Sequence, residues 1–275
     1  MVLESVATAS LAKRRPEEFI FYGFIVATVA LLLSIWVFPA YASFALVTFT
    51  VMATLPLMVS VIKSEKEKIK DTPDIKQYKK TMLFFVFLFS GYILAFLLWF
   101  IILPVETSNN LFFLQLNTIA QINSPTGGAI FASSFGTIIM NNLKILGFAV
   151  LFSFIFGSGA IFILTWNASV ISAAVGSTIK IAIAAGQAGS ASYLSAAVYG
   201  LARYLIHGIP ELTGYFLGGL AGGIISFAVL DYKLGSKKFF KSVKNAIKSS
   251  GVLLIAAVIF LVMAALIELA VVAVY

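Results

Sequence analysis

Long apolar stretches alternate with short clusters of charged residues along the chain. Asp, Glu, Lys and Arg are all absent from residues 19–62, 81–105, 145–179, 212–230 and 249–267. Each stretch is long enough for at least one membrane-spanning helix of about 20 residues. Strands of a membrane barrel alternate apolar and polar positions, whereas these stretches are apolar on every side. The pattern therefore predicts an all-α polytopic membrane protein.

The apolar pattern predicts seven transmembrane helices. Six are expected near 19–38, 43–62, 82–103, 142–165, 209–230 and 250–273, with a tight turn at Pro39 between the first two. Residues 166–206 are too long for one plain helix, so one crossing plus a half-membrane or interfacial piece is predicted there. We expect three parts: an N-terminal membrane segment at 1–103, an outer loop at 104–141, and a membrane core at 142–275.

The distribution of basic residues predicts the orientation in the membrane. Seven lysines against four acids lie in residues 63–80, and six lysines lie in 231–248, whereas residues 104–142 contain no lysine or arginine. Loops rich in Lys and Arg stay in the cytoplasm. The basic residues just before the first apolar stretch then place the N-terminus in the cytoplasm as well: Lys13, Arg14 and Arg15. We expect a multi-pass protein of the cell membrane.

Two further segments have the pattern of interfacial helices. In residues 109–123 the apolar side chains recur at helical spacing, with polar ones between them, which predicts a helix on the outer leaflet. In residues 233–248 four lysines form one helical stripe, opposite Phe240, Val243 and Ile247. These lysines are expected to face anionic lipid headgroups on the inner leaflet, unless the segment is only a solvated linker: Lys237, Lys241, Lys244 and Lys248.

Composition and motifs exclude several classes of protein. The net charge of +8 arises from lysines beside apolar stretches, so lipid rather than nucleic acid is the expected partner. The chain has no cysteine and one histidine, too few ligands for a typical zinc site. It contains neither a phosphate-binding G-x-x-x-x-G-K-[ST] motif nor a G-x-S-x-G motif. We expect no catalytic residue, cofactor or metal.

Small residues dominate one face of the helix expected at 209–230. Glycines recur every fourth residue at Gly214, Gly218 and Gly222, with Gly219 and Gly223 beside them. Such faces let helix backbones approach closely, and in lipid this packing drives helix association. The spacing predicts a packing face, within the chain or between chains of an oligomer; the lining of a cavity is the alternative.

The single histidine, His207, stands four residues before Glu211. Gly208 and Pro210 between them predict that one helix ends near His207 and the next begins near Pro210. Glu211 would then lie at the positive end of a helix dipole, with Arg203 as its candidate partner. Two interpretations stay open: a structural cap, or a proton-relay or substrate site at a broken helix, as in many transporters.

Two stretches in the second half combine unusual residues. Residues 140–176 contain Asn141, Asn142 and Lys144 at the head of a helix, then Gly157, Gly159 and Asn167; residues 206–223 contain His207, Gly208 and Glu211 before the glycine-rich helix. Over about 140–230 the chain thus resembles the stage II sporulation protein M family of polytopic membrane proteins. The resemblance implies a membrane scaffold, which in spore formers serves peptidoglycan-degrading partners during engulfment. It also implies that His207 and Glu211 matter, without assigning their role.

Packing features without catalytic motifs favour a non-enzymatic membrane scaffold or assembly subunit. The glycine face would mediate assembly, and the basic helix would contact the inner leaflet or a cytoplasmic partner. The alternative is a transporter or permease subunit whose pathway passes the helix break at His207 and Glu211. An intramembrane enzyme would need more chemical groups than this small cluster supplies.

Overall fold

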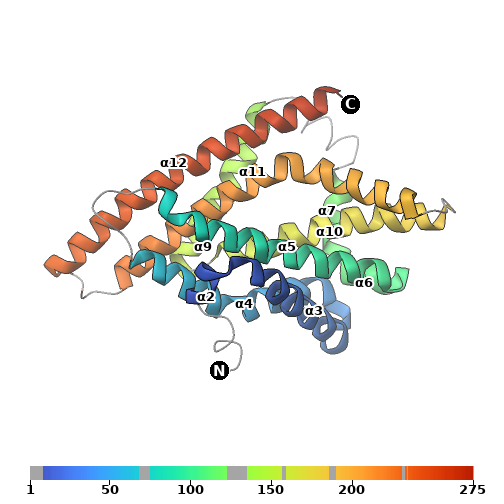
Figure 1. Ribbon diagram of the computed structural model, residues 1–275, viewed down its shortest axis with the longest axis horizontal. Helices are drawn as coiled ribbons and strands as arrows, with labels where there is room; N and C mark the ends of the chain where they lie inside the picture. Colours follow the sequence, from blue (N-terminus) through green and yellow to red (C-terminus); the bar gives the residue numbers. More distant parts are fainter. Residues whose placement is uncertain are drawn as a thin grey trace.

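The computed structural model describes residues 9–67, 75–122, 135–156, 159–185, 190–230, 233 and 235–274, and over these residues it is helical without strands. Seven helices within the described ranges are long and apolar enough to cross a membrane. They form an elongated bundle (Figure 1). They are α3 (Phe19–Val37), α4 (Ala42–Lys66), α5 (Lys79–Ile102), α9 (Phe135–Phe156), α10 (Ala160–Ala184), α11 (Ser190–Leu230) and α12 (Lys237–Val274). The remaining elements are α2 (Ala9–Arg14), α6 (Val105–Leu111), α7 (Phe113–Ile122), η1 (Pro16–Glu18), η2 (Pro39–Tyr41) and η3 (Ile75–Tyr78).

The first three spans agree with the helices expected from the apolar pattern, including the tight turn at Pro39, where η2 joins α3 to α4. Helices α3 and α5 cross closely at Gly23 and Gly91, because a Cβ on either glycine would meet backbone atoms of the other helix. A hydrogen bond also joins α4 to α5, because the hydroxyls of Thr54 on α4 and Tyr92 on α5 lie 2.6 Å apart.

The segment between α5 and α9 differs from the single interfacial helix predicted for 109–123. It forms two short helices, α6 and α7, and its apolar residues Leu116 and Ile119 pack against the protein core rather than facing lipid. Gln115, expected on the polar face, is 0% exposed. Its amide accepts from Ser43 of α4 and donates to Ser169 of α10, at 2.7 and 3.1 Å. Because both amide atoms are bonded, the polar group can be buried.

The middle of the chain corrects the helix predicted at 142–165. Helix α9 ends at Phe156 and α10 begins at Ala160, so the predicted helix spans a junction between two helices. A Cβ at Gly159 would collide with the backbone of α9 at Phe152 and Ser153, and the Ser153 hydroxyl accepts from the Ala160 amide at 3.0 Å. Gly159 and Ser153 therefore allow the start of α10 to pack closely against α9. One crossing plus a half-membrane or interfacial piece was predicted for 166–206; in the structure the segment is divided between α10, which ends at Ala184, and α11, which begins at Ser190.

Helix α11 is continuous from Ser190 to Leu230, with Pro210 inside it. The helix break predicted at 207–210 is therefore wrong; the chain bends instead, and Figure 1 shows the arched course of α11. Proline removes one backbone hydrogen bond and kinks a helix. In lipid no water is available for the other backbone groups, so the helix continues through the kink.

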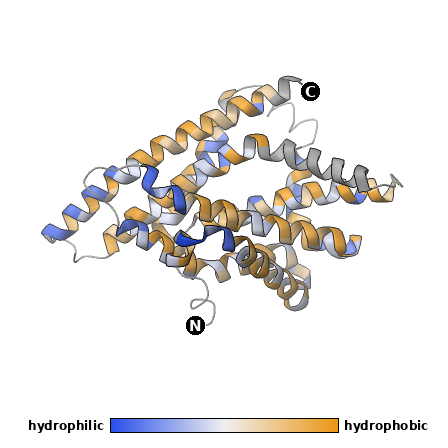
Figure 2. Ribbon diagram, in the orientation of Figure 1, coloured by the Kyte–Doolittle hydropathy of each residue, from blue (hydrophilic) through white to orange (hydrophobic). Residues whose placement is uncertain are grey.

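Helix α12 also corrects a prediction. The basic segment expected to lie as a separate helix on the inner leaflet is the start of one unbroken helix, Lys237–Val274. The side chain of Tyr78, just before α5, lies next to Ser249 of α12. Residues 237–248 form about 18 Å of helix before this contact. Figure 2 shows this hydrophilic end of α12 projecting from the bundle.

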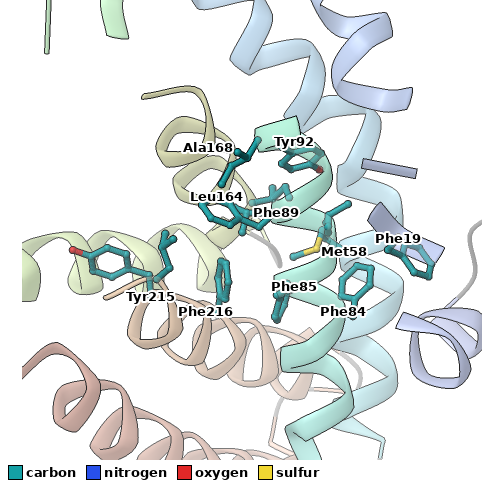
Figure 3. Close-up of a cluster of buried hydrophobic side chains, with 14 of the residues drawn as sticks. Phe19, Met58, Phe84, Phe85, Phe89, Tyr92, Leu164, Ala168, Tyr215 and Phe216 are labelled. Carbon is teal, nitrogen blue, oxygen red and sulfur yellow. The ribbon is translucent and has the colours of Figure 1, made fainter. Parts of the chain in front are cut away.

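A row of aromatic rings connects the N-terminal helices to α11 (Figure 3). Phe19 of α3 packs against Phe84 with centroids 4.9 Å apart, and Phe85 stacks on Phe216 of α11 at 5.0 Å. Phe84 and Phe85 are neighbours on α5, 5.4 Å apart. The row makes α5 the central helix between the two halves, and it ends one residue from Tyr215, a member of the polar cluster described next.

Candidate functional site

Glu211 is the one acidic member of the predicted cluster, and the structure places it on α11 between Pro210 and the glycine face. The side chains of Arg203 and His207 lie outside the described residues, so their predicted pairing with Glu211 stays a prediction. Gly208 is buried, yet a Cβ built on it meets no atom within 4 Å. Close packing therefore does not require glycine at this position.

The described partners of Glu211 come from its own helix and from α9. The Tyr215 hydroxyl lies 2.6 Å from Oε1 of Glu211 and 3.2 Å from Oδ1 of Asn142 on α9. Asn142 is 4% exposed, and its Nδ2 has no hydrogen-bond partner. Glu268 of α12 lies near enough for its charge to act on Glu211 and Tyr215. Three helices thus bring four polar groups to one junction, which we call the Glu211 junction.

The glycine face of α11 positions this junction by holding two helices close. A Cβ on Gly218 would meet Leu146 of α9, and one on Gly222 would meet the backbone carbonyl of Val150. Two turns earlier in α11, a Cβ on Gly214 would lie 2.9–3.0 Å from atoms of Leu261 and Ala257 of α12, closer than ordinary van der Waals contact. Each of these neighbours belongs to the same chain.

Gly219 packs in the same way, against Ala160 at the start of α10 and Ser153 of α9, and Gly223 is buried on the same helix. The contacts described for Gly214, Gly218, Gly219 and Gly222 are thus made inside the chain. An oligomer built through this face would require α9 or α12 to separate from α11. The regular glycine spacing has a sufficient explanation in packing within the chain.

Within the described ranges, no group of three or more His, Asp or Glu side chains is placed to hold a metal ion. The Glu211 junction offers two carboxyl groups, one phenol and one amide. Among the described residues it contains no thiolate and no imidazole. Such a set can exchange protons or bind a hard cation.

Comparison with known proteins agrees with the resemblance noted in the sequence. The family model described as Stage II sporulation protein M matches residues 80–271, well over half of the chain. The chain belongs to the stage II sporulation protein M family. No curated protein and no solved structure matches it.

The match to the stage II sporulation protein M family covers the chain from α5 to α12. It begins at Lys80, one residue into α5, and ends near the end of α12. All of α9–α11, the Glu211 junction and the basic start of α12 lie within it. Helices α2, α3 and α4 lie outside it. The match is wider than the 140–230 expected and includes α5, which sequence analysis grouped with the N-terminal segment.

The basic start of α12 is the second candidate site in this family member. The four lysines of the predicted stripe are exposed: Lys237, Lys241, Lys244 and Lys248. Two large apolar side chains of the same segment are also exposed, Phe240 at 63% and Ile247 at 56%. The segment therefore presents charge and apolar surface together, near the N-terminal end of α5.

Sequence reasoning missed three members of the Glu211 junction as partners of Glu211. Tyr215 stands four residues after Glu211, one helical turn away, and this spacing alone could have indicated the contact. Glu268 is the only charged residue in 249–275, and an isolated carboxylate in an apolar helix is a sign of function. Nothing in the sequence indicated that Asn142 on α9 lies beside Tyr215.

Proposed function

We propose that this member of the stage II sporulation protein M family is a non-enzymatic membrane scaffold, which uses the basic start of α12 as its docking element. One observation carries the proposal: α12 continues unbroken past the inner end of α5 with its lysines exposed. A helix of 38 residues is about 57 Å long, whereas the hydrocarbon core is about 30 Å thick. The excess length extends the docking element beyond the membrane.

Charge and depth indicate what the docking element contacts. Lys248 lies beside Ser249, at the level of the start of α5, so Lys244 and Lys248 are at headgroup depth. Each lysine near an anionic membrane surface contributes about 1 kcal/mol. Lys237 and Lys241 lie farther out, within reach of an acidic surface on a cytoplasmic partner. The exposed Phe240 and Ile247 add apolar area for such a contact.

The close packing within the chain also supports a scaffold. Helix α11 is held by α9 and α12 through its glycines, and by α5 through the ring of Phe216. A bundle joined in this way keeps the docking element at a constant position relative to the membrane. The permease alternative rested on a helix break at 207–211, and α11 is continuous there. We therefore do not propose a pathway at that position.

The experiment reverses two charges in the docking element, Lys241→Glu and Lys244→Glu together. We expect loss of the chain's cross-linked complexes in native membranes, and fewer anionic lipids bound to the purified protein in native mass spectrometry. The matched control reverses two exposed lysines at the start of α5, Lys79→Glu and Lys80→Glu, on the same side of the membrane. Equal complexes and equal lipid binding in both variants would refute the proposal.

A further inference from the structure

The exposed side of α9 contains a polar residue among aromatic ones. The buried residues of this helix lie along another side, against the rest of the chain: Ile138, Asn142, Leu146, Ala149 and Ser153. Asn141 is exposed, and so are Phe148 at 57% and Phe152 at 44%. At about 100° per residue, these three lie within about 40° of one another around the helix. The rings of Phe148 and Phe152 are 6.3 Å apart. We call these three residues the α9 face.

Contacts between helices fix the depth of Asn141. The neighbouring residue, Asn142, lies 3.2 Å from the hydroxyl of Tyr215, and the next residue of α11, Phe216, stacks on Phe85 of α5 at 5.0 Å. Phe85 lies six residues after the start of α5, which is about 9 Å along the helix. Lysines at the start of a span mark the edge of the hydrocarbon core, which is about 30 Å thick. Asn141 therefore lies within the hydrocarbon region.

The amide of Asn141 lacks a partner at this depth. Its side chain is exposed, and it makes no hydrogen bond within the part of the chain that the structure describes. Hydrocarbon offers no water to replace that bond, so an unpaired amide there is unfavourable. Exposed Lys144 differs, because its long side chain can carry the ammonium group to the interface. The short side chain of Asn141 cannot, and its partner must come from another helix outside this chain.

A second copy of the chain supplies such a helix with matching chemistry. Copies in one membrane have the same orientation, so two α9 helices related by a two-fold axis run parallel and place equal residues at equal depth. An amide has both donors and an acceptor, so two Asn141 side chains can bond to each other reciprocally. Lys144 lies about 60° around the helix from Asn141, at the edge of this contact, which keeps the two like charges apart.

We propose that the α9 face joins two copies of this chain within the membrane, with the Asn141 amides hydrogen-bonded across the two-fold axis. Polar side chains join helices in lipid in this way. The rings of Phe148 and Phe152 add aromatic packing on either side of the axis. This contact leaves the glycine face of α11 packed inside each chain. The inference goes beyond the proposed scaffold function and does not rest on it.

The first test places single cysteines in the full chain, which has none of its own, and oxidises native membranes with copper phenanthroline. Phe148→Cys should form a disulfide-linked dimer of the chain. The matched control is Gly147→Cys, at the adjacent exposed residue, where a Cβ meets no atom within 4 Å. This position points about 100° away from Phe148 and should form at least about tenfold less dimer. Equal yields from the two positions, or a disulfide to a different protein instead, would overturn the proposal.

The second test measures the contribution of the amide itself. The purified full chain, labelled at a cysteine replacing exposed Lys238, is reconstituted in lipid vesicles, and energy transfer between copies is followed against the protein-to-lipid ratio. Asn141→Leu should raise the ratio needed for half dimerisation about tenfold, whereas Asn141→Gln, which keeps a donor and an acceptor, should restore most of the affinity. Dimerisation of Asn141→Leu as strong as that of the unaltered chain would refute the Asn141 contact. Both readouts report on copies of this chain alone, and not on complexes made through the docking element.

Discussion

At the scale of single residues, glycines determine how closely two helices approach, because they have no side chain. Gly222 faces the backbone carbonyl of Val150, which cannot move aside as a flexible side chain could. Gly147 of α9 has no atom within 4 Å of a built Cβ. Both glycines lie in the interior of spanning helices, so they differ chiefly in what surrounds them. One is required by packing and the other is not.

Substituting alanine at each of these two glycines tests how one added methyl group affects stability. Gly222→Ala should lower the free energy of unfolding by about 1–3 kcal/mol, because the methyl overpacks the contact between α9 and α11. Gly147→Ala should leave it unchanged or raise it by up to about 1 kcal/mol, through helix propensity. Unfolding in mixed detergent micelles measures both. Equal effects of the two substitutions would contradict close packing at Gly222.

At the scale of elements, the continuity of α12 is the feature on which the proposed function depends. A basic amphipathic segment is expected to lie flat on a membrane, but here it shares one helix with the last span. Ser250 fixes the position of this helix, because its hydroxyl donates to the Ala221 carbonyl of α11 at 2.9 Å. The lysines before it are therefore directed away from the bundle.

Spin labels test this continuity directly, since the chain contains no native cysteine. Labels on cysteines replacing Lys241 and Met263, two exposed positions, should lie about 33 Å apart along a straight helix, before allowance for the label arms. A right-angled bend at Gly251 that laid the segment on the membrane would reduce this distance to about 23 Å. Pulsed electron spin resonance in lipid nanodiscs distinguishes the two. The shorter distance would contradict the projecting docking element.

At the scale of the whole molecule, the seven candidate spans and the placement of lysines describe one arrangement in the membrane. With an odd number of spans, the two ends of the chain lie on opposite sides. The junctions between α4 and α5 and between α11 and α12 carry the lysine clusters, whereas α6 and α7 carry no basic residue. The positive-inside rule therefore predicts that the N-terminus and the docking element lie in the cytoplasm.

Single cysteines test this orientation in intact cells. A membrane-impermeant thiol reagent should label a cysteine replacing Glu106, which lies in α6, and should label one replacing Lys238 only after the membrane is permeabilised. Both positions are exposed, so access depends on the side of the membrane and not on burial. Labelling of the Lys238 position in intact cells would reverse the proposed topology.

Local patterns were enough to predict the helices that begin or end next to charged residues or a proline. The turn at Pro39 and the start of α5 after Tyr78 lie within a few residues of their predicted positions. The junction between α9 and α10 was missed because its signals, Gly159 and Ser153, lie within a stretch that has no charged residue. Pro210 misled in the opposite direction, since a proline that would end a helix in water only bends one in lipid.

The sequence by itself determined the membrane class, the helical fold, the family and the charge distribution, because each depends on composition, periodicity or motifs within one short stretch. Only the tertiary structure decided that the glycines of α11 pack against α9 and α12. It also decided that Asn142 and Glu211 meet at the hydroxyl of Tyr215, although they lie far apart along the chain. Contacts between distant helices depend on helix rotation and crossing, which no local pattern specifies.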